Sequence, residues 1–351
     1  MAIWLKSFVK TSLIVFLGCV LMSSVLDVTP GVGDSLVTFT IQPSSLNLVV
    51  QRPPERESSQ ASSGFTFALT ADMRNFSGEG TYDTSEYFRG AVESMESLGV
   101  VDFMISPGDI DPTENVHWTI TQVFGVEFLW YPIVGNHELP GAGFEDYVGD
   151  NMNWLRTYEY GVVNAGPSGC PTTTFSFDVQ NAHFIALNEY CDAGGDTATS
   201  GDITDHLYNW LSDDLNNTEA DHIFVIGHEP AYPQPDADND RMRHEYDSLN
   251  QYLANRDRFW SLLQDFEVLA YLCGHTHNYS VVEIDGIWQM DVGHARGVGD
   301  TGARSTYVLV EVDGEVVSYK AYRDDANGGS YTLMHSGFLS AIHTYIPFVT
   351  R

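Results

Sequence analysis

The amino-acid sequence predicts a mixed α/β domain in which layers of sheet are covered by helices. From residue 64 onward, short apolar runs with the character of buried strands recur, and helical patterns separate some of them. Toward the C-terminus, two Asp-Gly pairs lie between β-prone runs, which is a strong hairpin pattern. The chain therefore begins as β-α-β and ends as an antiparallel meander. Because no clean boundary interrupts residues 63–325, we expect one domain there.

The individual elements are predicted from the periodicity of apolar residues and from residues that begin or end helices and strands. Residues 84–98 place apolar side chains on one helical face, with a capping-box spacing at Asp83 and Glu86 and a stop at Gly99. Similar patterns predict helices over 203–215 and 256–264. The expected buried strands are 65–69, 100–105, 128–134, 222–226 and 268–273. The expected hairpins join 281–284 to 287–290 and 307–312 to 315–322.

Both ends of the chain differ in amino-acid composition from this domain. Lys6 and Lys10 precede an apolar stretch, so residues 1–26 are a secretory signal peptide or an uncleaved N-terminal anchor. Residues 27–62 have the composition of a Ser/Pro/Gly-rich linker or extended arm, and 326–351 form a C-terminal tail. We expect a secreted, periplasmic or extracellular protein, released or tethered to a membrane through its N-terminus. In such a compartment Cys170 and Cys191 form a disulfide or remain two thiols.

The formal net charge of −32 limits the classes of partner. The only lysines are Lys6, Lys10 and Lys320. A generic nucleic-acid surface needs basic side chains to neutralise phosphates, so that class is excluded. An acidic surface instead keeps a protein soluble in a salty or extracellular setting.

Five short polar loops follow the five apolar runs. In open α/β sheets, functional loops gather beyond the carboxyl ends of strands, so we expect these loops to converge. They gather Asp, Asn and His, whose side chains suit divalent metals such as Mn, Fe or Zn. The loops are Asp72-Met-Arg74, Gly108-Asp109, Gly135-Asn136-His137-Glu138, Gly227-His228 and Gly274-His275-Thr276-His277.

This constellation indicates a two-metal hydrolytic site. Metals about 3.5–4 Å apart bind a water between them and lower its pKa toward ~7, and the hydroxide attacks phosphorus. Asp109 is placed to bridge the metals. His137 is expected to protonate the leaving oxygen or, alternatively, to orient a ligand. Glu138 is expected to be structural.

The same motifs, in this order, resemble the calcineurin-like metallophosphoesterase superfamily, which includes purple acid phosphatases. The resemblance runs over roughly residues 65–295 and implies a two-sheet β-sandwich flanked by helices, with His137 as the catalytic histidine. It also implies two sets of metal ligands that share one aspartate. The first ligand set is Asp72, Asp109 and His277, and the second ligand set is Asp109, Asn136, His228 and His275.

The first ligand set departs from the family pattern. Arg74 stands where the family usually has a histidine, and the tyrosine that purple acid phosphatases supply is replaced by Pro112. Arginine has no lone pair to offer a metal. Three alternatives follow: a weaker metal completed by water, a substitute ligand such as Asn75 or Asp111, or an Arg74 that binds substrate phosphate with its planar donors.

The sequence thus predicts an exported metal-dependent phosphoesterase with one or two divalent or trivalent ions. Its partner would be a small phosphorylated substrate, either a phosphomonoester or a small phosphodiester. One alternative is a non-catalytic secreted metal- or phosphate-binding domain with a degenerate first site. Another is a single-metal hydrolase that uses only Asn136, His228 and His275.

Two further features are less specific. Asp236-x-Asp238-x-Asp240 has the spacing of a calcium loop, but Arg241 replaces the expected glycine, so the alternative is a long solvated loop near the substrate entrance. His294 borders the pocket with Arg296 or has a structural role. The remaining histidines, including His244, are expected on the surface or in the core.

Overall fold

A computed structural model of the 351-residue chain describes residues 64–73, 84–139, 151–161, 163–196, 198, 200–296, 302–324 and 330–340, and the segments 27–28 and 348–349. The chain divides into two compact units, Met1–Ala61 with Ile342–Arg351, and Ser62–Ala341. In the first unit, β1 (Asp27–Val28) pairs antiparallel with β15 (Phe348–Val349). The predicted signal or anchor over 1–26 lies outside the described residues, as does nearly all of the predicted linker over 27–62. Within the described part, no helix is both long and apolar enough to span a bilayer.

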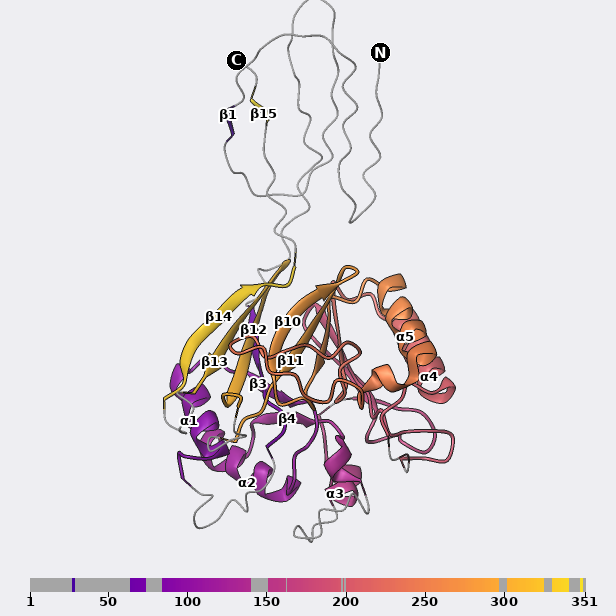
Figure 1. The fold of residues 1–351 in the computed structure, drawn as a ribbon, viewed down its shortest axis with the longest axis horizontal. Coiled ribbons are helices and arrows are strands. Elements are labelled where there is room, and N and C mark those ends of the chain that lie inside the picture. The colour runs from indigo at the N-terminus through magenta and orange to yellow at the C-terminus, as the bar shows by residue number, and fades with distance from the viewer. Residues whose placement is uncertain are drawn as a thin grey trace, which may run out of the picture. The chain divides into compact units, whose positions relative to one another are not determined.

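The second unit contains a sheet of six described strands in the order β14-β13-β12-β2-β3-β4 (Figure 1). Strands β2, β3 and β4 are parallel, and the C-terminal strands add to β2 antiparallel. The strands are β2 (Phe65–Leu69), β3 (Phe103–Ser106), β4 (Leu129–Pro132), β12 (Thr306–Asp313), β13 (Val316–Arg323) and β14 (Thr332–Phe338).

The other sheet has seven described strands in the order β10-β11-β9-β8-β7-β6-β5. Its central part, from β7 through β8 and β9 to β11, is parallel. The strands are β5 (Asn164–Ala165), β6 (Phe175–Val179), β7 (Ala182–Ala186), β8 (His222–Ile226), β9 (Ala270–Cys273), β10 (Tyr279–Ile284) and β11 (Ile287–Val292). The predicted fold class, two sheets flanked by helices, is therefore confirmed.

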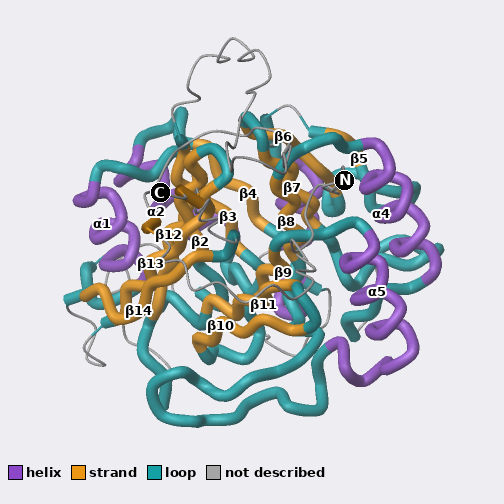
Figure 2. Tube along the Cα trace, turned by 90° about the horizontal axis from the view of Figure 1, so that it is seen from above, coloured by secondary structure: helices purple, strands orange, loops and turns teal. Residues whose placement is uncertain are grey.

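Helices cover the outer face of each sheet. Figure 2 shows α1 (Phe88–Leu98) and α2 (Thr113–Phe124) on one side of the strands, and α4 (Asp205–Asn217) and α5 (Leu253–Asp265) on the other. The apolar faces of α1 and α2 pack with the six-stranded sheet, and those of α4 and α5 pack with the seven-stranded sheet. The short α3 (Asn151–Thr157) and the 3₁₀ turns η2 (Asn136–Glu138) and η3 (Leu249–Tyr252) complete the unit.

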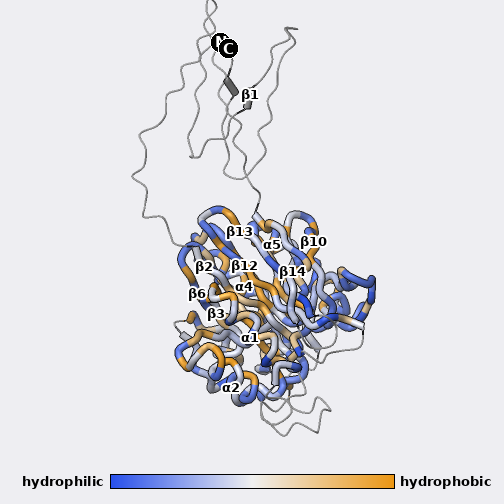
Figure 3. The backbone as a smooth tube through the Cα atoms, turned by 90° about the vertical axis from the view of Figure 1, so that its left-hand side faces the viewer, coloured by the Kyte–Doolittle hydropathy of each residue, from blue (hydrophilic) through white to orange (hydrophobic). Residues whose placement is uncertain are grey.

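The alternation of side chains along the strands builds these layers. Phe67 on β2 points into the core between the sheets, whereas Ala68 packs on the helix side. The Phe67 ring lies 5.5 Å from that of Phe103, 5.1 Å from Phe184 and 5.3 Å from Phe224. Figure 3 shows hydrophobic stretches along the strands and hydrophilic loops at the margin. An aromatic layer thus joins the two sheets.

All three predicted helices are found, with shifted ends. Those expected over 203–215 and 256–264 correspond to α4 and α5. The first helix begins at Phe88, later than predicted, with Tyr87 as its N-cap, so no helical turn starts at Glu86. Gly99 ends it as expected, with φ of 63°.

Both predicted hairpins form. The Asp285-Gly286 turn joins β10 to β11, with Ile284 opposite Ile287. In the second hairpin Asp313 pairs with Val316, so its turn lies one residue later than expected. Strand β14 falls within 326–351, which the sequence suggests is a tail, and extends the sheet beyond residue 325. Its side chains are mostly exposed, so they lack the apolar alternation that marks a strand.

The structure also decides between the two alternatives for Cys170 and Cys191. Cys170 and Cys191 are joined by a disulfide, and both are buried. Cys273 is buried at the end of β9 as a free thiol.

Candidate metal centre

Strand ends from both sheets meet at the candidate metal centre. Strands β2, β3 and β4 of the six-stranded sheet lead into the loops with Asp72, Asp109 and Asn136. Strands β8 and β9 of the other sheet lead into those with His228 and the His275–His277 motif. The site therefore depends on how the two sheets face each other.

The second ligand set gathers closely. The Oδ1 atom of Asn136 lies 3.2 Å from His228 Nε2 and 3.2 Å from His275 Nδ1, and these two nitrogens lie 3.3 Å apart. The Oδ1 atom of Asp109 lies 3.3 Å from His228 Nε2. Ligand atoms from four loops thus converge on one point.

The outer nitrogens of the two imidazoles show where their protons reside. His228 Nδ1 lies 2.7 Å from the carbonyl oxygen of Pro107, and His275 Nε2 lies 3.0 Å from that of Asp247. A carbonyl oxygen only accepts, so both outer nitrogens donate, and in the neutral rings the inner nitrogens keep their lone pairs. Lone pairs that face one another and an amide oxygen fit a shared cation.

The first ligand set is smaller but also fits a cation. One ligand atom from each of Asp72, Asp109 and His277 lies within 4.8 Å of the others. The Asp72 carboxylate is fully buried, and its Oδ1 finds no hydrogen-bond partner among the described residues. Burial opposes its charge, but His277 and the neighbouring histidines hold the pKa of Asp72 well below its usual range. A buried carboxylate with an unused oxygen is suited to a metal.

The loop backbones are strained at these positions. Asp72, Asp109, His275 and His277 have φ of 54°, 55°, 70° and 58°. Non-glycine residues adopt this left-handed region at a cost of about 1–3 kcal/mol each and keep it only where the surroundings enforce it. Such strain clusters at functional sites.

The motif glycines permit a close approach of the loops. A Cβ atom at Gly108, where φ is 80°, would lie 2.4 Å from His228 Nδ1. A Cβ at Gly274 would lie 2.7 Å from Asp72 Oδ2. Larger residues would push apart loops that belong to different sheets.

Besides Asn136, the third loop contributes His137 to the site and Glu138 to its support. His137 Nε2 lies 3.7 Å from Asp109 Oδ2, and its backbone N–H donates to Asp109 Oδ1 at 3.0 Å. The Glu138 carboxylate accepts the N–H groups of Asp109 at 3.0 Å, Ile110 at 2.7 Å and Gly135 at 2.6 Å. Glu138 therefore ties the second loop to the third, the structural role expected for it.

Comparison with known proteins identifies the family. The family model for calcineurin-like phosphoesterases matches residues 65–279. The chain belongs to this family. A search of curated protein sequences finds no significant match.

Solved structures of similar fold agree with the family assignment. GAP50, described as the anchor in the inner membrane complex of Plasmodium, has 18% identity and a TM-score of 0.50, over 79% of this chain and 89% of its own. PhoD has 11% identity and a TM-score of 0.51, over 82% of this chain and 72% of its own. At these identities the likeness shows the fold alone.

Arg74 and Asn75 lie outside the described residues, so the alternatives that involve them stay predictions. Asp111, the other proposed substitute ligand, is buried and accepts the Asn151 side-chain amide at 2.6 Å. It is not part of the group formed by the first ligand set.

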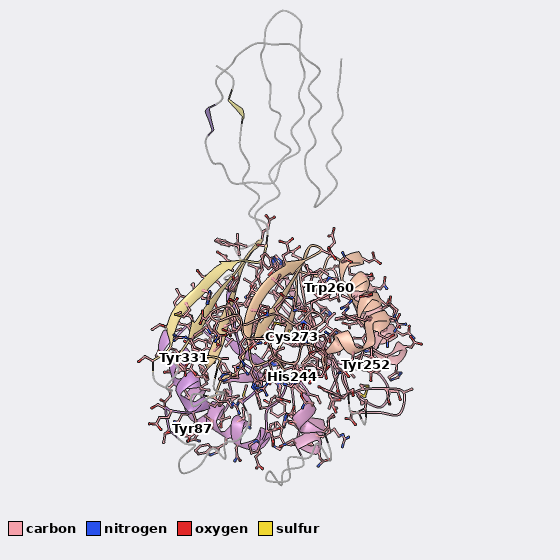
Figure 4. The ribbon with its side chains drawn as sticks, viewed as in Figure 1. Tyr87, His244, Tyr252, Trp260, Cys273 and Tyr331 are labelled. Carbon is pink, nitrogen blue, oxygen red and sulfur yellow. A yellow bond between two sulfur atoms is a disulfide. The ribbon has the colours of Figure 1, made fainter. Side chains whose placement is uncertain are left out.

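A long loop brings residues that the sequence did not single out. The His244 ring lies 4.3 Å from that of His275, and its Nδ1 lies 2.8 Å from Asp247 Oδ2. Figure 4 labels His244 and also Cys273, the last residue of the strand β9 that leads into the His275 loop. Arg243 Nη1 lies 2.7 Å from His277 Nδ1. The only sequence signal was the position of this loop after the His228 motif.

The acidic triplet in the same loop binds an arginine. Asp236 Oδ2 lies 2.7 Å from Arg323 Nη2, and Asp238 Oδ2 lies 2.8 Å from Arg323 Nη1. The Arg323 side chain is completely buried. Two of the three carboxylates are therefore neutralised from within the chain, which argues against a calcium loop, and Asp236 is buried rather than solvated.

His294 lies in the protein interior, as its structural alternative predicts. It is fully buried, with Nε2 3.3 Å from the carbonyl oxygen of Ala303 and its ring 5.9 Å from that of His277. Burial lowers the pKa of His294 to about 3, so the ring is neutral at ordinary pH.

Two buried glutamates that sequence reasoning missed support the His228 loop. Glu189 Oε2 accepts the N–H of His228 at 3.1 Å and that of Glu229 at 2.7 Å, and its Oε1 accepts the Tyr271 hydroxyl. Burial and the charge of Glu229 raise the pKa of Glu189 to about 8, and burial raises that of Glu229 to about 7. Both side chains thus resist ionisation in the folded chain.

This gives a pH-dependent stability. The pKa of Glu189 rises from 4.5 to about 8 on folding, so its contribution is complete below pH 4.5 and is lost as pH rises to 8. Burial lowers the pKa of His228, but the nearby Asp109 and other carboxylates outweigh it and raise the pKa to about 9. A raised His228 pKa also makes the free energy of unfolding fall as pH rises, from about pH 6.5 to 9. With a chelator present, the free energy of unfolding should fall between about pH 5 and 8, and Glu189→Gln should reduce this slope by up to about 1.4 kcal/mol per pH unit, the value for one proton.

Urea denaturation at a series of pH values measures this slope. Glu93→Gln is the matched control, because Glu93 is an exposed partner of Arg89 on α1. An equal slope in Glu189→Gln and the parent would contradict the role of Glu189.

Proposed function

We propose that this chain is an exported metal-dependent phosphoesterase that hydrolyses phosphomonoesters or small phosphodiesters. The observation that carries the proposal is the convergence of Asn136, His228 and His275 within 3.3 Å of one another, with both imidazoles held by carbonyl oxygens on their outer nitrogens. The family supports a hydrolase of the phosphoesterase type. The disulfide supports export, because such bonds persist in oxidising compartments.

The second ligand set would hold one ion, and the first ligand set would hold the other, with Asp109 common to both. A bound cation would supply Lewis acidity, which favours deprotonation of water near neutral pH and offsets charge on phosphoryl oxygens. Mn, Fe and Zn all suit these ligands. Because the chain is strongly acidic, a small phosphorylated substrate fits better than a long polyanion.

His137 has the position of a general acid. Hydrolysis forms a bond between a water oxygen and phosphorus and breaks the bond from phosphorus to the leaving oxygen. We assign His137 Nε2 to give its proton to that leaving oxygen. His137 Nε2 lies 3.7 Å from Asp109 Oδ2, which places the ring beside the ligands of both sets. Glu138 holds the loops of Asp109 and His137 together, so it orients both.

A non-catalytic metal- or phosphate-binding domain is the second candidate. It is favoured by the replacement of the family histidine by Arg74 and by the likeness to GAP50, which is described as an anchor. Metal-dependent turnover discriminates between the two candidates.

The first prediction of this proposal concerns turnover itself. The purified chain should hydrolyse p-nitrophenyl phosphate or its bis-ester with Mn, Fe or Zn and lose activity in chelator. His228→Ala and Asp109→Asn should each lower kcat/KM by at least about 100-fold, since losing even a hydrogen-bond partner of a ligand costs 10–100-fold. His206→Ala, on the partly exposed face of α4, should retain activity. No turnover with any metal would favour the binding domain.

The second prediction isolates the proton donor. His137→Ala should lower kcat by about 10²–10⁴-fold on an alkyl phosphate, whose leaving oxygen needs a proton. On p-nitrophenyl phosphate the loss should be much smaller, because nitrophenolate leaves without protonation. Steady-state rates on both substrates measure this difference. An equal loss on both would assign His137 to ligand orientation instead.

A further inference from the structure

The loop that carries His244 also delivers a permanent cation to the first ligand set. Arg243 is only partly exposed, and its Nη1 lies 2.7 Å from Nδ1 of His277. The imidazoles of the second ligand set are instead held on their outer nitrogens by neutral groups, the carbonyl oxygens of Pro107 and Asp247.

The chemistry of this contact conflicts with metal binding. A guanidinium only donates hydrogen bonds, so His277 Nδ1 must accept with its lone pair. In the neutral ring the proton then resides on Nε2, which faces Asp72 Oδ1 at 3.3 Å. With one nitrogen bonded to Arg243 and the other protonated, the ring has no lone pair left for a metal.

We propose that Arg243 competes with a metal ion for His277 and thereby makes the two metal sites unequal. The second ligand set binds its ion tightly, and the first ligand set binds one only when Arg243 withdraws. The inference rests on the metal-dependent function proposed above and adds a residue that controls how many ions that function uses.

The charges of the first ligand set agree with this competition. The Asp72 side chain is fully buried, and a carboxyl group at such a position is stabilised by positive charge nearby. Arg243 brings a fixed positive charge to the same side of the set, at the histidine that faces Asp72. The ligand count agrees as well, because Arg74 has replaced a family histidine and leaves the set with fewer ligands to compete against a guanidinium.

Metal titration tests the proposal directly. The full chain is stripped with chelator and titrated with Mn²⁺ alone by isothermal calorimetry, with bound metal counted by elemental analysis. The parent should bind one equivalent tightly and a second at least about tenfold more weakly. Arg243→Met should bind the second equivalent at least about tenfold more tightly and leave the first unchanged. Arg243→Lys, which keeps the charge, should gain less than Arg243→Met.

Two controls make the outcome specific. Arg89→Met removes the same charge from the surface of α1 and should titrate like the parent. His277→Ala in the Arg243→Met background should abolish the gain. Equal affinity for two ions in the parent, or an unchanged second affinity in Arg243→Met, would overturn the inference. Turnover is not part of this readout, so a chain that binds metal as predicted but hydrolyses no ester refutes only the proposed function.

Discussion

The contact between the two sheets determines where the metal ligands lie. Aromatic rings from both sheets interlock between them, with Phe67 of one against Phe184 and Phe224 of the other. Asp109 comes from the six-stranded sheet and His228 from the seven-stranded sheet, yet their ligand atoms lie 3.3 Å apart. A shift of about 1 Å between the sheets would separate the donors, and close-packed interiors resist such shifts. The same packing enforces the left-handed backbone at the loops, because loops from the two sheets lie in close contact, as Gly108 does with His228 and Gly274 with Asp72.

Charge balance is the second constraint on the site. Buried carboxylates need hydrogen bonds or cations, and the chain supplies both in different places. Glu138 receives three backbone N–H groups, and Asp236 receives the buried Arg323. Asp72 keeps an unused oxygen beside His277, and Arg243 approaches from the other side of that ring. Cations of either kind therefore stabilise the site, and their competition connects the stability of the centre with its chemistry.

Local sequence sufficed for the features that depend on local chemistry. Apolar runs followed by polar ligands, with a glycine before the ligand in four of the five loops, predicted both the strand ends and the six metal-ligand candidates, because each loop carries its own signal. Helix α2 was missed because β-branched residues such as Val116, Ile120 and Val123 lower the helix propensity of its sequence. Arg243 and Glu189 were missed because only the tertiary fold brings them to the ligands. No periodicity or spacing marks a loop residue that reaches a site formed by distant strands.

The central claim is that a metal ion binds where Asp109, Asn136, His228 and His275 converge. Anomalous diffraction from crystals of the full chain grown with Mn²⁺ tests it most directly. The account predicts that the strongest anomalous peak lies within about 2.0–2.3 Å of His228 Nε2 and His275 Nδ1, the usual range for such ligands. A map without a peak at that point, or with its strongest peak away from these side chains, would contradict the account.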